Sequence, residues 1–252
     1  MRPYLVFRLY GPMASWGQPA VGGERHTGMM PSRSALLGLL GAALGIKREN
    51  DAQLENLRQS VLFGIKQVTS GALLRDYHTT QVAANNNKIH YHTRKQELEM
   101  GKLATVLSSR DYRCDGLWII AVSLTKQSAF TLGQLQQALL KPTYPLCLGR
   151  KSCPPALPLM PKILTSCSLK QALDSPFPAI TNSNKSDQYW LSGGSKHSVA
   201  TYYWQGDKEW LDDLGENVVI TTQPWDEPVS RARWQFASRA MHQVTLPISK
   251  DE

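Results

Sequence analysis

The chain has 252 residues, of which 42% are hydrophobic and 19% charged, a composition that is typical of globular domains and excludes wholesale disorder. Its formal net charge of +8 favours a polyanionic partner, most often nucleic acid, although a merely basic surface gives the same count. The longest apolar run has about 12 residues, fewer than the about 20 that a membrane-spanning helix needs, so we expect no membrane partner.

The first element in chain order is a strand at Tyr4–Tyr10, where alternating side chains predict one core-facing side. Arg8 interrupts the apolar stretch, which favours a strand over a signal peptide, and we therefore expect a cytoplasmic protein. Residues 11–33 follow as a loop rich in glycine, proline and serine. Loops of this length in a compact domain are usually functional.

A glycine-containing helix follows this loop within residues 29–46. Gly38, Gly41 and Gly45 recur along it, and each glycine inside a helix costs about 1 kcal/mol relative to alanine. We therefore expect this glycine stripe to pack closely against the sheet or a neighbouring helix. Residues 51–60 are typical of a second, amphipathic helix, and residues 61–68 of the next strand.

A polar, basic stretch then interrupts the pattern. From Thr79 to Arg113 it has few apolar side chains and a turn signal at Asn85–Asn87, which predicts an extended hairpin projecting from the body. An apolar strand at 117–124, a helix at 131–142 and a strand within 158–164 come next. This order fits an α+β, ferredoxin-like β-α-β-β-α-β fold with the hairpin inserted between its second and third strands.

Two basic loops carry the clearest binding signal. Arg25 and Arg33 flank the segment that leads into the glycine-containing helix, whose N-terminal N–H groups and dipole favour phosphate. Arg150 and Lys151 lie in a second loop that begins with a glycine. Trp16 either stacks on a base or packs within the protein, and the sequence does not separate these two interpretations.

The sequence predicts neither a nucleotide-binding motif nor a metal site. Gly23 and Gly28 have the glycine spacing of a phosphate-binding loop, but methionines stand where lysine and serine or threonine are needed. The four cysteines include no C-x-x-C pair, and we expect no metal and no cofactor.

A metal-independent ribonuclease is the alternative that the residues leave open. Such cleavage needs a base for the 2′-hydroxyl and an acid for the leaving oxygen. Tyr77 and His78, beside Arg75, offer such groups. The same side chains suit base stacking and phosphate binding equally well.

Five stretches, spread in order from the N-terminus to Arg239, resemble one family. They are the run from Tyr4 to Ile46, "LRDYHT", "RDYRCDG", "LKPTYPLCLGRKSCP" and "QFASR". Together they are similar to the CasD-type subunits of CRISPR type I-E Cascade complexes, within the repeat-associated RNA-binding superfamily. Residues 176–228 show little likeness to that family.

The resemblance implies a fold, a role and partners. The fold is a modified RNA-recognition palm, formed by residues 1–78 and 114–252, with a β-hairpin thumb at 79–113 and a poorly matched insertion at about 176–228. The role is non-catalytic: the subunit caps one end of the complex and holds the 5′ handle of the CRISPR RNA, while a separate subunit cleaves that RNA. The implied partners are the CRISPR RNA, the backbone subunit and the large subunit that reads the PAM, with target DNA reached indirectly through the complex.

The expected interface combines the basic and aromatic side chains of these loops, the hairpin and the matched motifs. No catalytic residue is expected among them. The candidate RNA-binding residues are Trp16, Arg25, Arg33, Arg75, Tyr77, His78, Arg94, Lys95, Arg110, Arg150, Lys151 and Arg239.

Overall fold

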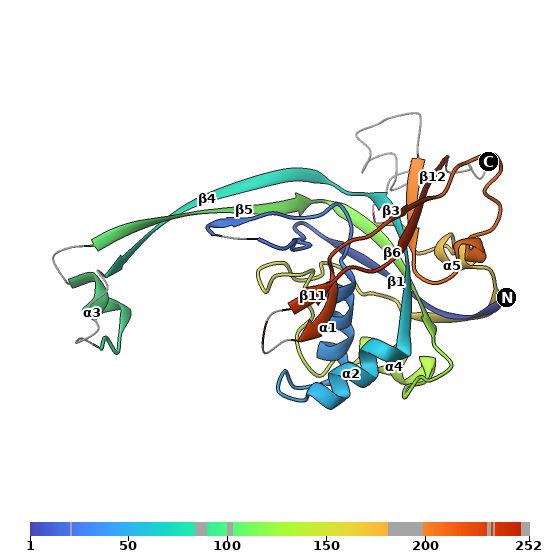
Figure 1. Ribbon diagram of the computed structural model, residues 1–252, viewed down its shortest axis with the longest axis horizontal. Coiled ribbons are helices and arrows are strands. Elements are labelled where there is room, and N and C mark those ends of the chain that lie inside the picture. The colour runs from blue at the N-terminus through green and yellow to red at the C-terminus, as the bar shows by residue number, and fades with distance from the viewer. Residues whose placement is uncertain are drawn as a thin grey trace.

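The computed structural model describes residues 1–20, 22–83, 90–99, 103–180, 199–230, 233 and 235–247. These residues form a mixed α+β protein built on a large antiparallel sheet, from which a long hairpin projects (Figure 1). The seven described strands of this sheet lie in the order β7-β1-β6-β3-β8-β12-β9, and every neighbouring pair is antiparallel.

Four strands make the half of the sheet that the sequence predicted. They are β1 (Arg2–Gly11), β3 (Val61–Thr69), β6 (Gly116–Leu124) and β7 (Lys162–Cys167). The other half extends the sheet beyond β3 with β8 (Val199–Trp204), β12 (Met241–Pro247) and the edge strand β9 (Ile220–Thr222). Strands β8 and β9 thus come from the segment that resembled the family least.

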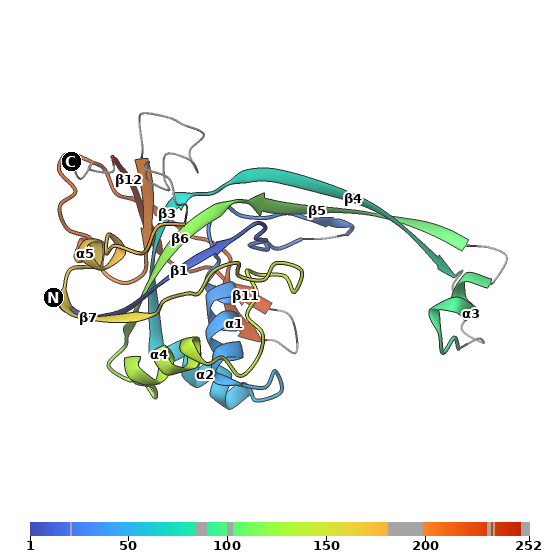
Figure 2. The same cartoon turned by 180° about the vertical axis from the view of Figure 1, so that it is seen from behind.

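Helices cover both faces of the sheet (Figure 2). The helices α1 (Arg33–Leu44), α2 (Asp51–Ser60) and α4 (Leu132–Leu140) lie on one face, and the short α5 (Leu169–Leu173) lies on the other. Leu5, Phe7 and Leu9 of β1 face the first group, whereas Tyr4 and Val6 belong to the second core cluster. The expectation of a single core-facing side for β1 is therefore wrong, because α5 packs against its other side as well.

Helix α1 is held by its apolar side and its caps, and tight packing of its glycines contributes little. Ser32 caps its first turn by accepting a hydrogen bond from the Ala35 N–H. Gly45 ends the helix with φ of 73°, a conformation that favours glycine. A Cβ placed on Gly38 would meet no atom within 4 Å. A Cβ placed on Gly41 would lie 3.8 Å from a Leu57 methyl, an ordinary contact, so the expected close packing is wrong for these two glycines. At Gly45, by contrast, a Cβ would lie 2.8 Å from the Thr143 side chain.

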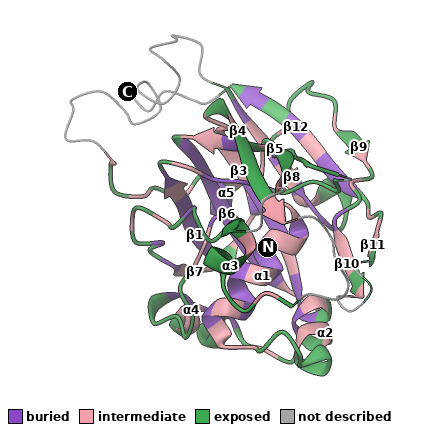
Figure 3. Ribbon diagram, turned by 90° about the vertical axis from the view of Figure 1, so that its left-hand side faces the viewer, coloured by how far each residue is buried: buried purple, intermediate pink, exposed green. Residues whose placement is uncertain are grey.

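The projecting hairpin pairs β4 (Ala72–Ala83) with β5 (Leu103–Cys114). Its ladder begins at Ala72, earlier than the expected Thr79, and most of its side chains are exposed (Figure 3). The helix α3 (Arg94–Glu99) lies at its far end, and the turn expected at Asn85–Asn87 falls outside the described residues. The short strand β2 (Glu24–Arg25) runs parallel to β5 near the body and makes the root of the hairpin three-stranded.

Three smaller elements complete the described structure. They are the 3-10 helix η1 (Lys208–Trp210) and the paired strands β10 (Glu227–Ser230) and β11 (Gln235–Ala237). Strand β10 packs beside the start of α1, and this contact decides how two of the predicted site residues are used.

Candidate nucleic-acid interface

Basic residues from four separate segments lie at the root of the hairpin. Arg25 of β2 lies opposite Arg110 of β5 in the parallel pairing. Arg150, from the loop that follows α4, donates hydrogen bonds to the backbone oxygens of Arg25 at 3.0 Å and Asp111 at 3.4 Å. We call this group the root cluster; it comprises Glu24, Arg25, His26, Arg75, Arg110, Asp111 and Arg150.

The buried carboxylate of Asp111 binds two side chains of the root cluster, Arg75 and His26. Its side chain is 5% exposed and receives hydrogen bonds from Arg75 Nε at 2.8 Å and Arg75 Nη2 at 3.1 Å. His26 Nδ1 lies 3.0 Å from the same carboxylate. The Arg75 hydrogen bonds are the main reason that the pKa of Asp111 is lowered to about 2, so this carboxylate is ionised at neutral pH. It therefore fixes the orientation of Arg75, whose own side chain is 57% exposed.

The loop that carries Arg150 is fixed at two points. Leu148 is fully buried in the core beside it. Gly149 has φ of 91°, and a Cβ there would collide with the Ser15 carbonyl oxygen, so this position needs glycine. The Arg150 guanidinium lies 5.0 Å from the centre of the Tyr112 ring and is held over it. The cation is thus presented by a rigid loop.

Tyr77 and His78 lie on opposite faces of the hairpin. They are neighbours on β4, and successive side chains of a strand point to opposite sides. Tyr77 is 63% exposed and shares the face of Arg75. His78 pairs with Asp76 at 2.7 Å on the other face, where Arg110 also lies. The two side chains therefore do not converge on a single ligand atom.

Arg94 and Lys95 lie far from the root, on α3 at the tip of the hairpin (Figure 1). Arg94 pairs with Glu97 at 2.5 Å and bonds to the Gln81 carbonyl, whereas Lys95 is 84% exposed. Lys151 is exposed and lines a separate open hollow of about 760 Å³ beside α1. These three cations can contact a long ligand that also contacts the root cluster, but they do not form a single site with it.

Trp16 is part of the protein core. It is 1% exposed, and its ring packs edge to face against Trp118 with the ring centres 5.1 Å apart. A ring buried in this way cannot stack on a base in this conformation. Of the two interpretations of Trp16 that the sequence left open, the structure shows packing.

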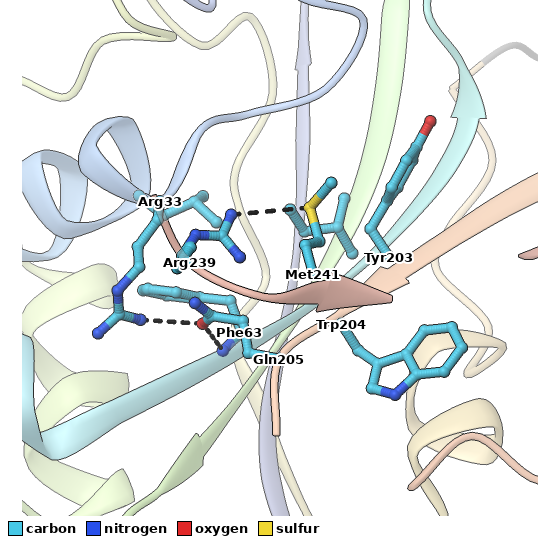
Figure 4. Close-up of a pocket in the computed structure, with 9 residues that line it drawn as sticks. Arg33, Phe63, Tyr203, Trp204, Gln205, Arg239 and Met241 are labelled. Carbon is cyan, nitrogen blue, oxygen red and sulfur yellow. Dashed lines mark hydrogen bonds between the residues drawn. The ribbon is translucent and has the colours of Figure 1, made fainter. Parts of the chain in front are cut away.

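Arg33 is likewise internal, with 5% exposure (Figure 4). Its guanidinium donates to the carbonyl of Val61 at 3.1 Å and to the Gln205 side chain at 2.9 Å. Its Nε lies 2.6 Å from a Glu227 carboxylate oxygen, and burial lowers its pKa. Arg33 therefore ties α1 to β3, to β10 and to the residue that follows β8.

A carboxylate of the chain itself occupies the start of α1. The backbone N–H of Arg33 donates to Asp226 at 2.7 Å, and Arg239 pairs with that carboxylate through Nε at 2.7 Å. Asp226 thus takes the place that the sequence analysis assigned to a phosphate. Arg33 and Arg239 are not part of the interface that we propose below, because their charges are already neutralised inside the protein.

Sequence reasoning missed the acidic partners of these cations. The Arg75–Asp111 pair depends on the exact register of the hairpin, which a polar turn sequence does not specify. Asp226 and Glu227 lie almost 200 positions from Arg33, in a segment without a recognisable pattern. The stretch "RDYR" was the one available signal that Asp111 does not neutralise Arg110, because neighbouring residues of a strand point to opposite faces.

Among the described residues, no group of three or more histidine, cysteine, aspartate or glutamate side chains is placed to hold a metal ion. No helix in that part of the chain is both long and apolar enough to cross a membrane.

Comparison with known proteins identifies the family. A model of the CRISPR-associated protein family Cas5 matches residues 4–242, and the chain belongs to this family. The protein described as CRISPR system Cascade subunit CasD, from Escherichia coli (strain K12), is 36% identical over 252 residues, covering 97% of this chain and 96% of that protein.

Two solved structures share the fold. A chain of a CRISPR RNA-guided surveillance complex has a TM-score of 0.60 at 22% identity, covering 97% of this chain and 89% of that chain. A crystal structure of a Cas protein has a TM-score of 0.61 at 23% identity, covering 97% of this chain and 95% of that chain. The large antiparallel sheet is therefore an architecture that other CRISPR-associated proteins also have.

Proposed function

We propose that the chain is a cytoplasmic, non-catalytic subunit of a CRISPR type I-E Cascade complex, which caps one end of the complex and holds the 5′ handle of the CRISPR RNA. The root cluster is the observation that carries this proposal. Four arginines from separate segments lie there on the two faces of the hairpin, and the buried Asp111 carboxylate orients Arg75. Family membership supports the assignment to Cascade.

The chemistry of the root cluster suits single-stranded RNA. Guanidinium groups make charge-assisted, often bidentate, hydrogen bonds to phosphate, which fix the register of a strand on the protein. Tyr77 offers an exposed aromatic face beside Arg75 for a base to stack on. Arg94 and Lys95 at the tip, and Lys151 beside α1, would contact more distant parts of the RNA.

The finer fold assignment belongs to the same proposal. The strand order β7-β1-β6-β3, with helices between β1 and β3 and between β6 and β7, supports a ferredoxin-like palm of the RNA-recognition type. The projecting β4–β5 hairpin is the thumb of this arrangement. Its insertion between β3 and β6 leaves the palm contiguous in space.

The hairpin is also the surface that we assign to protein neighbours. Leu73, Val106 and Leu107 are 53%, 46% and 53% exposed on it, and Leu98 at the tip is 43% exposed. These exposed apolar side chains are spread along a projecting element and are available to a protein partner. We propose that the backbone subunit and the large PAM-reading subunit contact this chain, and that target DNA is reached only through the assembled complex.

The geometry weighs against the ribonuclease alternative. An acid and a base that cleave one phosphodiester must both reach it, yet Tyr77 and His78 point to opposite faces of β4. Incubation of the purified chain with repeat RNA should leave the RNA intact. Specific cleavage that is lost in His78→Ala would favour the nuclease.

Co-purification tests the proposed function. The tagged chain, expressed with its CRISPR array and the other Cascade subunits, should retain CRISPR RNA. Arg25→Ala and Arg110→Ala remove exposed cations of the root cluster, and each should lower the dependence of RNA affinity on salt by about 0.7 in log–log slope per lost phosphate contact. Lys126→Ala, which removes an exposed cation in the turn after β6, is the control and should keep the wild-type slope.

A further inference from the structure

His26 has an unusual position within the root cluster, because each of its ring nitrogens faces a carboxylate. Nδ1 lies 3.0 Å from Asp111 Oδ2, and Nε2 lies 3.1 Å from Glu24 Oε2. A neutral imidazole has a single N–H and can donate to one of them, leaving a lone pair against the other. The imidazolium ion donates to both, so this geometry fits protonated His26.

The surroundings of His26 support the charged form. The hydrogen bond to Asp111 is the main factor that raises the pKa of His26 above its ordinary value of about 6.5. Asp111 stays ionised, since its own pKa is lowered to about 2. The charged groups on the neighbouring segments are Glu24 and Arg25 on β2, Arg75 on β4, Arg110 and Asp111 on β5, and Arg150 on the loop after α4.

We infer that His26 is a further residue of the RNA site, and that its positive charge makes the affinity of the root cluster for the RNA backbone depend on pH. This inference rests on the proposed function, and it assigns a role to a side chain outside the set that the sequence analysis selected. Protonated His26 adds one positive charge to a cluster of four arginines and two carboxylates, and it lies on the carboxylate that also holds Arg75. After deprotonation His26 can no longer neutralise Glu24, whose side chain is 69% exposed beside Arg25.

The direction of the pH effect follows from linkage. A polyanion favours the imidazolium form, so bound RNA raises the pKa of His26 further, and binding takes up protons. Affinity should be high below the pKa of free His26 and should fall as pH rises through the interval between the free and bound values. With one proton taken up, the loss is at most about tenfold per pH unit.

The test measures RNA affinity and proton uptake together. Fluorescence anisotropy on the full-length chain, with a single-stranded RNA of the repeat-derived 5′ segment, gives affinity from about pH 6 to pH 8.5 at constant ionic strength. Calorimetry in two buffers of different ionisation enthalpy counts the protons. The wild type should take up protons and lose affinity as pH rises.

Three variants separate His26 from other groups. His26→Gln should bind RNA with a pH-independent affinity close to the weak, high-pH limit of the wild type, and should take up no proton. Glu24→Gln should shift the fall in RNA affinity to lower pH, because it removes one of the two carboxylates that stabilise the imidazolium form of His26. His92→Gln changes an exposed histidine at the far end of the hairpin and should keep the wild-type pH dependence.

The outcomes distinguish this inference from the proposed function. A wild type that binds RNA with no pH dependence, or a His26→Gln variant that keeps it, overturns the role of His26 and leaves the RNA-binding proposal standing. A chain that binds no RNA at any pH, alone or in the assembled complex, contradicts the proposed function itself. Equal proton uptake by the wild type and His26→Gln assigns the titration to another group and likewise overturns the inference.

Discussion

Asp111 offers the clearest test of how the root of the hairpin is stabilised. Asp111→Asn keeps the size of the side chain but removes the charge that holds Arg75 and His26. A pKa lowered from 3.8 to about 2 corresponds to about 2.5 kcal/mol at about 1.36 kcal/mol per unit. Because Arg75 is 57% exposed, solvent screening reduces this value, and we expect a loss of about 1–2 kcal/mol in the free energy of unfolding.

The pH dependence provides the signature of this carboxylate. Its folded pKa is depressed, so its contribution is fully present above the unfolded value of about 3.9 and is lost as pH falls towards about 2. Urea unfolding of the wild type and Asp111→Asn between about pH 2 and 7 should show a gap that is constant from about pH 5 to 6, closes in acid, and narrows as pH rises past the ordinary pKa of His26, whose raised pKa depends on Asp111. Equal stability of the two proteins at neutral pH would refute the reasoning.

Other predictions concern the glycine helix, the buried arginine and the hairpin. Gly38→Ala should stabilise the protein by about 0.5–1 kcal/mol because open space surrounds that position. Gly45→Ala should destabilise it by about 1 kcal/mol because φ is 73° there. Thermal unfolding measures both changes, and a loss of stability in Gly38→Ala would reveal a contact that the structure lacks. Arg33→Ala should cost about 3 kcal/mol, at the lower end of the range for breaking a buried ion pair, because the partly buried Glu227 keeps only Arg58 as a partner. The folded fraction should keep its RNA affinity, and a stable variant with weakened RNA binding would return Arg33 to the interface. Replacing residues 79–107 with a short Gly-Ser turn should leave a folded body by circular dichroism and should sharply reduce Cascade assembly; normal assembly would contradict the role of the hairpin.

The elements with strong periodicity were predictable from the sequence. The alternating first strand, the apolar strand at 117–124 and the helices near residues 33–44, 51–60 and 132–140 all correspond to described elements. These predictions succeeded because the spacing of hydrophobic residues along the chain depends directly on the local secondary structure and on which side is buried. The second core cluster, between α5 and the sheet, was missed because its side chains come from distant segments that show no simple pattern.

The candidate site was only partly predictable, for electrostatic reasons. Residue type identifies a cation, but exposure and partners decide whether its charge reaches a ligand. Arg25 and Arg33 look alike in the sequence, yet Arg25 is exposed and Arg33 is enclosed by Glu227 and Gln205. The difference arises from tertiary contacts with a segment almost 200 residues away, which no local pattern encodes.

Ultraviolet cross-linking of the assembled complex tests the central claim most directly. The CRISPR RNA is cross-linked in place, the protein is digested, and mass spectrometry identifies the modified peptides. The account predicts adducts of the 5′ handle on peptides that contain Tyr77 and the root cluster, with fewer in Arg110→Ala. Adducts confined to peptides around Arg33 and Arg239, with RNA retained, would show that the RNA lies elsewhere on the protein.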